Sequence, residues 1–152
     1  MTKLAGSCQC GSITFTSELE PMFVNQCNCE RCRKMFGVVQ ASAIFADHEV
    51  EFKGEPSIYT FEGGSGGKIH AHFCPICATK THFYADALDG LVGIVLGTID
   101  DNHKYPPNSE IFTNYKLNWL KDNGCITESF EEAAVYERLE KVIKSLEDRD
   151  IL

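Results

Sequence analysis

The sequence contains no run of about 20 apolar residues, the length that a helix needs to cross a bilayer. Its first residues, MTKLAGSCQCG, also lack the apolar stretch of about 7–15 residues that a secretory signal peptide carries. Positive charge is scarce, because 14 Lys and Arg stand against 22 Asp and Glu, and neutralising phosphates requires a basic surface. We therefore expect a soluble, cytoplasmic protein that binds neither membranes nor nucleic acids.

Low-complexity sequence is almost absent as well, apart from a short glycine-rich stretch at residues 61–68. Hydrophobic residues make up 43% of the chain and charged residues 24%, which is the composition of an ordinary globular protein. A chain of 152 residues fits one domain that is large enough to bury a real core.

Seven short segments have the residue types and alternation of β-strands and are separated by turn residues. This pattern predicts a single, mainly β domain. The last segment is apolar almost throughout and predicts a central, buried strand. The seven segments are residues 12–17, 39–46, 49–54, 56–63, 68–74, 81–86 and 91–99.

The C-terminal part differs in kind. Ser129 and Glu132 have the spacing of a capping box, and they precede a stripe of apolar residues at helical spacing. We expect an amphipathic helix over residues 129–149, packed on the β domain or on a second copy of the chain in a homodimer. The chain would then divide into a β domain at residues 1–124 and a helical extension at residues 125–152. The stripe comprises Val135, Leu139, Val142, Ile143 and Leu146.

Eight cysteines are the most informative residues of the chain. In a reducing cytosol thiols persist and serve as metal ligands or nucleophiles rather than as disulfides. Cys125 stands alone and is expected to be a partly buried free thiol. The other seven form three clusters, at Cys8 and Cys10, at Cys27, Cys29 and Cys32, and at Cys74 and Cys77.

The first and last clusters together offer four thiolates. Cys8 and Cys10 are separated by one residue, which in an extended strand places both side chains on one face. Cys74 and Cys77 form a C-x-x-C knuckle in which Pro75 helps to turn the chain. Four thiolates make the closed tetrahedral set of a structural zinc, and such a site contributes folding energy. We expect this zinc to tie the N-terminus to the middle of the chain.

The middle cluster, Cys27, Cys29 and Cys32, has one ligand too few for a structural zinc. Three thiolates could hold a second zinc whose fourth position is open to water or to a substrate thiol, as in catalytic sites. Two alternatives stay open. In the first, a neighbouring histidine closes the site or no metal binds. In the second, the cysteines belong to an iron–sulfur or redox centre.

Four cysteine-rich or glycine-rich motifs occur in a specific order: GSCQCG at 6–11, CNCERCR at 27–33, FCPIC at 73–77 and GTID at 97–100. In this order the chain resembles the glutathione-dependent formaldehyde-activating enzyme family, which also includes centromere protein V. The resemblance covers roughly residues 4–120 and includes EIFTNYKLNW at 110–119. It implies a mostly β fold with two zinc ions, one structural and one catalytic. Their ligands would be the four-cysteine and three-cysteine sets respectively.

The resemblance also implies an activity. Members of this family add glutathione to formaldehyde to give S-hydroxymethylglutathione, a carbon–sulfur lyase reaction when written in reverse. We expect Arg31, Arg33 and Lys34 to offset the negative charge of the thiolates or to hold the carboxylates of glutathione, unless they are solvated surface charges. Two other functions remain open, a non-catalytic zinc-binding interaction or scaffold module and a metal or redox buffer.

Two residues depart from the common pattern of the family. Asn28 stands where many relatives have histidine, which removes a titratable group beside the proposed metal. Ala78 follows the C-x-x-C knuckle where glycine is usual, and this matters if the backbone there requires a positive φ angle.

Overall fold

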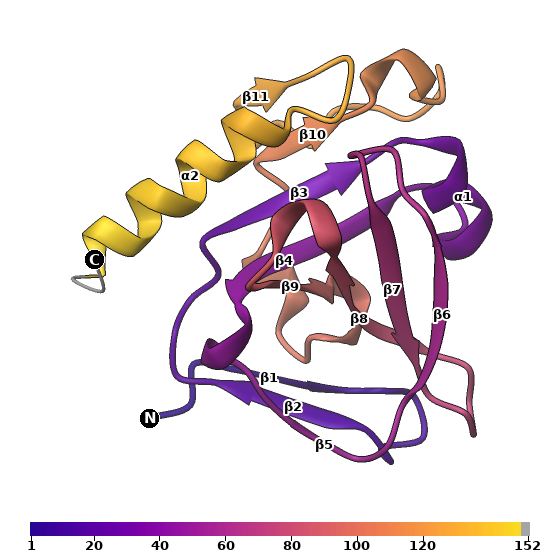
Figure 1. Cartoon of the computed structure of the whole chain (residues 1–152), viewed down its shortest axis with the longest axis vertical. Helices are drawn as coiled ribbons and strands as arrows, with labels where there is room; N and C mark the ends of the chain where they lie inside the picture. The colour runs from indigo at the N-terminus through magenta and orange to yellow at the C-terminus, as the bar shows by residue number, and fades with distance from the viewer. Residues whose placement is uncertain (150–152) are drawn as a thin grey trace.

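Two β-sheets and two α-helices make up the computed structural model, which describes residues 1–149 (Figure 1). The helices are α1 (Glu30–Phe36) and α2 (Val135–Asp148). The strands are β1 (Leu4–Ser7), β2 (Thr14–Ser17), β3 (Phe23–Cys27), β4 (Gln40–Ala46), β5 (Glu51–Lys53), β6 (Ser57–Glu62), β7 (Lys68–Phe73), β8 (Lys80–Ala85), β9 (Leu91–Val95), β10 (Ser109–Ile111) and β11 (Glu128–Ser129).

The larger sheet has eight strands in the order β11-β10-β3-β4-β9-β8-β7-β6. Its pairs are antiparallel except for β3 with β10 and β10 with β11, which are parallel. The mainly β class predicted from the sequence is confirmed, and all seven predicted strands are present. The predicted central strand is β9, which lies between β4 and β8.

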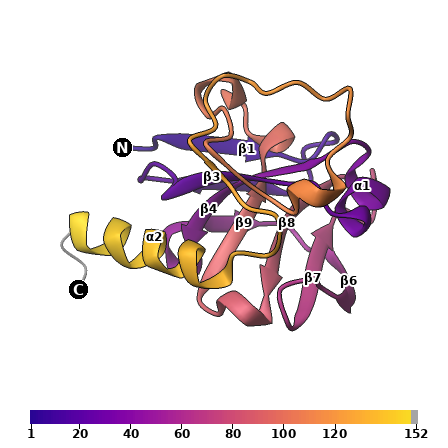
Figure 2. The same ribbon diagram turned by 90° about the horizontal axis from the view of Figure 1, so that it is seen from above.

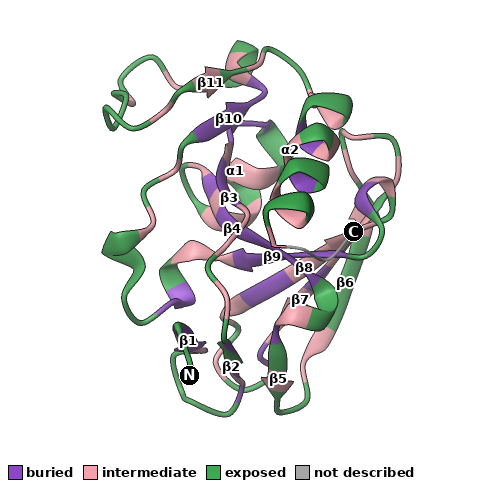
Figure 3. Cartoon of the chain, turned by 90° about the vertical axis from the view of Figure 1, so that its left-hand side faces the viewer, coloured by how far each residue is buried: buried purple, intermediate pink, exposed green. Residues whose placement is uncertain are grey.

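The smaller sheet, in the order β1-β2-β5, packs on one face of the larger sheet (Figure 1). Between them lies the main core, drawn from β3, β4 and β9 on one side and from β1 and β2 on the other (Figure 3). Because side chains alternate along a strand, the residues between these core positions face the opposite side of the larger sheet. The core includes Leu4, Phe15, Val24, Ala43, Phe45, Val92 and Ile94.

Helix α2 lies along one side of the molecule (Figure 2). Its Val142 is buried against Phe23, Ile44 and Leu91, and the rest of the predicted apolar stripe except Ile143 packs on the same cluster, on the β-sheet of the same chain. Ile143 was wrongly included in the stripe, because its side chain is exposed. Arg149, just after the helix, pairs with Glu49. No helix within residues 1–149 combines the length and the apolar composition that crossing a membrane requires.

The predicted start of this helix was wrong. Ser129 lies in β11, which pairs in parallel with β10, and its Oγ donates a hydrogen bond of 2.8 Å to Glu110 Oε1. The helix begins only at Val135, after Ala134 adopts a left-handed conformation with φ of 48°. The apparent capping box failed because its serine hydroxyl bonds to a carboxylate on the neighbouring strand rather than to a helical N–H.

Candidate functional site

Cys8, Cys10, Cys74 and Cys77 converge on one point, with their sulfur atoms all within 4.8 Å of one another. Cys8 Sγ lies 3.6 Å from Cys10 Sγ, which lies 3.7 Å from Cys74 Sγ. Tetrahedral zinc with bonds of about 2.3 Å places its sulfur ligands about 3.8 Å apart, so the donor set fits this metal. The four residues connect the turn after β1 with the turn between β7 and β8.

The local backbone of this four-cysteine group differs from the expectation in one respect. Cys8 and Cys10 do not lie on one face of a strand, because β1 ends at Ser7 and a turn follows, closed by a 3.0 Å bond from Gly11 N–H to the Cys8 carbonyl. The turn brings the two sulfurs together where alternation along a strand was predicted to do so. Ala78, after the knuckle, has φ of 62°, the conformation that glycine adopts without strain.

Hydroxyl groups surround the four sulfurs. Ser12 Oγ lies 3.1 Å from the sulfurs of both Cys10 and Cys74, and Thr79 Oγ1 lies 3.1 Å from Cys77 Sγ. The side chain and the backbone N–H of Thr79 lower the pKa of Cys77 to about 5. Since the thiolate is the metal-binding form, this environment favours ligation.

Cys27, Cys29 and Cys32 form a second group whose sulfur atoms also lie within 4.8 Å of one another. Cys27 ends β3, Cys29 is the N-cap residue of α1, and Cys32 N–H donates to Cys29 Sγ at 3.4 Å. Hydrogen bonding from the thiols of Cys27 and Cys32 lowers the pKa of Cys29. No histidine or carboxylate of residues 1–149 joins this group, so a metal held here would keep an open coordination position.

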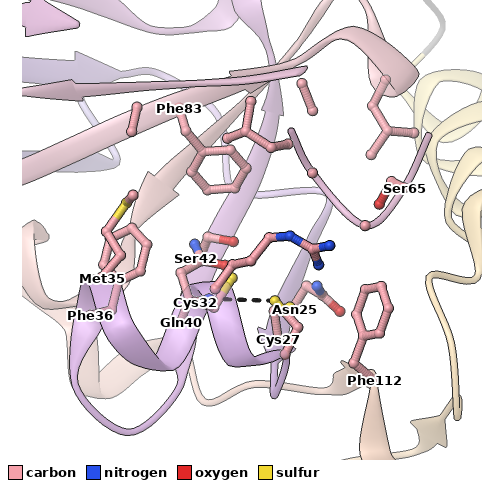
Figure 4. A pocket seen from close by; sticks show the side chains of 18 of the residues that line it. Asn25, Cys27, Cys32, Met35, Phe36, Gln40, Ser42, Ser65, Phe83 and Phe112 are labelled. Atoms are coloured by element: carbon pink, nitrogen blue, oxygen red, sulfur yellow. Dashed lines mark hydrogen bonds between the residues drawn. The ribbon is translucent and has the colours of Figure 1, made fainter. Parts of the chain in front are cut away.

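The three-cysteine group lines a pocket of about 90 Å³ on the face of the larger sheet that points away from the main core (Figure 4). Met35 and Phe36 of α1 lie on one side of the pocket and Phe112 on the other. Gly93 makes room for the ring of Phe83, because a Cβ at Gly93 would lie 2.2 Å from Phe83 Cζ. The pocket walls are mostly apolar, with Phe23, Ile44, Phe61, Ile69, Ala71, Ala85 and Leu88 completing them.

A wider cleft of about 690 Å³ adjoins this pocket and shares Arg31, Met35 and Phe61 with it. Two further cations, Lys34 and Lys80, line the cleft together with one carboxylate, that of Glu62. Its volume lies in the range of sites that hold small organic ligands, about 300–1,000 Å³. The small pocket and the cleft therefore form one continuous site. The part beside the cysteines is mostly apolar, and the wider part carries more positive than negative side chains.

The cations predicted from the sequence take different positions. Arg31 borders both the pocket and the cleft. Lys34 lines the cleft and pairs with Glu30 at 3.4 Å on the exposed side of α1. Arg33 donates a hydrogen bond to the Tyr115 carbonyl and lines neither cavity. Its position ties α1 to the segment after β10.

Arg138 of α2 also lines the pocket, although sequence reasoning did not single it out. Its side chain is 8% exposed and forms no ion pair with a carboxylate of residues 1–149. Burial lowers the pKa of Arg138, and the nearby Cys27 sulfur opposes that change. The signal was present, because position 138 follows Val135 by three residues and precedes Val142 by four, on the apolar face of the helix.

Gln40 and Ser42 of β4 are two more pocket residues that sequence reasoning missed. Gln40 pairs directly with Cys27 across the sheet, and Ser42 pairs with Asn25. Their side chains are 5% and 1% exposed, and Gln40 Nε2 and Ser42 Oγ have no hydrogen-bond partner within residues 1–149.

Asn28, the residue that departs from the family pattern, is buried and faces β10. Its Nδ2 donates to the Ile111 carbonyl at 3.0 Å and to Glu110 Oε2 at 3.3 Å. Lys116 Nζ lies 2.9 Å from the same carboxylate oxygen. The asparagine therefore anchors the cysteine-bearing segment to the neighbouring strand.

Comparison with known proteins identifies a family and a similar fold. A family model described as glutathione-dependent formaldehyde-activating enzyme matches residues 3–115. A crystal structure of a Rhodobacter sphaeroides protein is similar, with a TM-score of 0.52 and 18% sequence identity over 83% of this chain and 98% of that one. At that identity the similarity concerns the fold alone. Comparison with curated proteins finds no significant match.

Proposed function

Because this chain belongs to the glutathione-dependent formaldehyde-activating enzyme family, we propose that it catalyses zinc-dependent addition of glutathione, or a related thiol, to a small aldehyde such as formaldehyde. The reverse reaction is cleavage of a carbon–sulfur bond, as in a lyase. One observation carries the proposal. The three-cysteine group has no fourth ligand within residues 1–149, and it lines a small apolar pocket.

The two cysteine groups have different roles in this proposal. Cys8, Cys10, Cys74 and Cys77 would hold a structural zinc, because four thiolates leave no position for a substrate. Cys27, Cys29 and Cys32 would hold a catalytic zinc, which supplies an open coordination position and lowers the pKa of a thiol there. Two zinc ions per chain are therefore expected. A reducing cytoplasm would keep all seven thiols available.

The chain's own residues would bind and orient the substrate. Arg31, Lys34 and Lys80 supply the positive charge of the cleft, which suits the two carboxylates of glutathione. The thiol end of the tripeptide would then reach the cysteines through the border that Arg31 and Met35 share. A pocket of about 90 Å³ has room for only a few groups of the size of water, which favours a small aldehyde.

Apolar walls would also exclude bulk water from the reacting groups. Aromatic and aliphatic side chains surround the cysteines on the sheet face and on α1. In such surroundings a charge on sulfur or oxygen interacts more strongly with fixed donors than it does in water.

Zinc content and glutathione binding test the proposal together. We expect two zinc ions per chain in the protein purified without a metal-binding tag, and one in the Cys29→Ser variant. Calorimetric titration should detect glutathione binding to the first protein only. Cys125→Ser is the matched control, since Cys125 belongs to neither cysteine group and is exposed, not partly buried as predicted from the sequence. Two zinc ions without glutathione binding would favour a zinc-stabilised interaction module.

A further inference from the structure

Two buried polar groups of β4 face the pocket. Gln40 Nε2 and Ser42 Oγ are buried, line the pocket and make no hydrogen bond within residues 1–149. Leaving a buried donor unpaired costs about 1–3 kcal/mol. An apolar side chain of similar shape at either position would avoid that cost, so the stability of the fold does not account for these two residues.

The pair lies beside the three-cysteine group. Gln40 and Cys27 are directly opposite each other on adjacent antiparallel strands, where Cβ atoms are about 4.5–5.5 Å apart. Ser42 follows Gln40 by two residues and therefore shares its face of the sheet. Figure 4 shows Gln40, Ser42, Cys27 and Cys32 gathered in one part of the pocket.

The side-chain oxygen of a polar neighbour of this pair is already hydrogen-bonded. Asn25 Oδ1 accepts a hydrogen bond of 3.0 Å from Ser109 Oγ, and Asn25 lies opposite Ser42. Most of the remaining wall is apolar. Gln40 and Ser42 are thus buried donors without partners among residues 1–149, whereas Arg138, another polar residue of the pocket, already donates to Ser65.

We propose that Gln40 Nε2 and Ser42 Oγ donate hydrogen bonds to the oxygen of the aldehyde and of its thiol adduct, an inference that rests on the proposed function. In the addition, the thiol gives up its proton and a sulfur lone pair forms the bond to the carbonyl carbon. The carbonyl π electrons move onto oxygen, which then takes up one proton, so that thiol and aldehyde combine without oxidation or reduction. Two donors at the oxygen stabilise the charge that develops there.

Substitution of the two donors tests this inference. The variants are Ser42→Ala and Gln40→Met, and the rate of exchange between formaldehyde with glutathione and S-hydroxymethylglutathione is measured by NMR. Each substitution should lower the catalysed rate about 100-fold, the effect of losing one oxyanion donor. The midpoint of thermal unfolding should stay the same or rise, because an unpaired buried donor is removed.

Binding provides a readout that does not depend on turnover. S-ethylglutathione has the shape of S-hydroxymethylglutathione but lacks its hydroxyl group. We expect the unmodified protein to bind the hydroxymethyl compound at least about tenfold more tightly than the ethyl compound, the value of one hydrogen bond. Each variant removes one of the two donors and should therefore show a smaller preference for the hydroxymethyl compound than the unmodified protein does.

Ser17→Ala is the matched control, because Ser17 is a buried serine of β2 whose Oγ accepts a hydrogen bond from Leu19 N–H at 3.1 Å. It should lower stability and leave both the exchange rate and the ligand preference unchanged. If the Gln40 and Ser42 variants keep the normal exchange rate and the normal preference for the hydroxymethyl compound, the role of the two donors is disproved, but the proposed function is not. If the unmodified protein neither binds glutathione nor accelerates exchange, the proposed function fails, and the donor pair fails with it.

Discussion

Arg138 Nη2 donates a hydrogen bond of 2.8 Å to Ser65 Oγ, and so joins α2 to the loop between β6 and β7. Both residues line the pocket that contains the three-cysteine group. The same loop approaches the site at Gly64, where an added Cβ would lie 2.7 Å from Phe112 Cζ and 3.2 Å from Arg31 Nη1. The C-terminal helix therefore helps to enclose the candidate site, although the family model ends at residue 115.

Replacing Arg138 with Met should weaken glutathione binding about tenfold. The guanidinium is a buried cation in the pocket that has no carboxylate partner among residues 1–149, and a charged hydrogen bond is worth about 1.5–3 kcal/mol. Arg138→Lys keeps the charge and should lose less affinity. Titration calorimetry measures both variants, and equal affinity for glutathione in all three proteins would contradict a role for this charge.

Ala78→Gly should raise the free energy of unfolding by up to about 1 kcal/mol. Ala78 has φ of 62°, where an L side chain is strained by about 1–2 kcal/mol, and the greater freedom of glycine in the unfolded chain offsets part of the gain. Urea unfolding of the zinc-saturated proteins measures the difference. A loss of stability would show that the turn tolerates alanine without strain.

The two cysteine groups should differ in their effect on stability. The four-cysteine group joins the turn after β1 to the β7–β8 turn, whereas the three-cysteine group lies at the β3–α1 junction. Cys10→Ser should therefore lower the thermal midpoint by roughly 10 °C or more, because a structural zinc contributes several kcal/mol to folding. Cys29→Ser should lower it much less. Thermal unfolding followed by circular dichroism, with and without a chelator, tests this order.

His82 should make the protein sensitive to acid. Burial, followed by the charge of the nearby His72, lowers the pKa of His82 to about 3, whereas an unfolded histidine titrates near pH 6.5. The contribution of His82 to the free energy of unfolding is intact above about pH 6.5. It is lost as the pH falls toward 3, because in that range only the unfolded state takes up the proton. The free energy of unfolding should fall by about 2 kcal/mol from this group between pH 7.5 and pH 5.

The matched variant for this prediction is His82→Phe. His82 stacks on Phe52 with ring centroids 3.9 Å apart, so an aromatic replacement preserves the packing. Between the two pH values, chemical unfolding should show that the free energy of unfolding falls by about 2 kcal/mol less in the variant than in the unmodified protein. The acid sensitivity of the cysteine ligands is common to both proteins and does not affect this difference. Parallel losses would mean that His82 is protonated in the folded state.

Sequence reasoning identified the strands that carry their own pattern. Strands such as β4 and β9 contain runs of apolar and β-branched residues, and both were predicted. It missed β1 and β3, and it also missed β10 and β11, whose residues SEI and ES have little strand character. These strands exist because β10 pairs in parallel with β3, about 84 residues away in sequence, and β11 adds to its edge. Such long-range pairing leaves no local trace.

The cysteine groups could be predicted for a different reason. Metal-ligand spacing is a local property of C-x-C and C-x-x-C, so the sequence revealed which cysteines belong together. The partner residues were not predicted, because Gln40, Ser42 and Arg138 come from other elements. The sequence did contain a signal for Gln40 and Ser42. They precede Ile44 by four and two residues in β4, so these polar residues share the face of the strand that buries Ile44.

Exchange spectroscopy with ¹³C-labelled formaldehyde and glutathione tests the central claim most directly. We predict that the zinc-loaded protein accelerates exchange between free formaldehyde and S-hydroxymethylglutathione, that Cys125→Ser does so equally, and that Cys29→Ser does not, although it retains the zinc of the four-cysteine group. An exchange rate that is the same with the protein, with Cys29→Ser and with no protein would contradict the assignment of the three-cysteine group as a catalytic site.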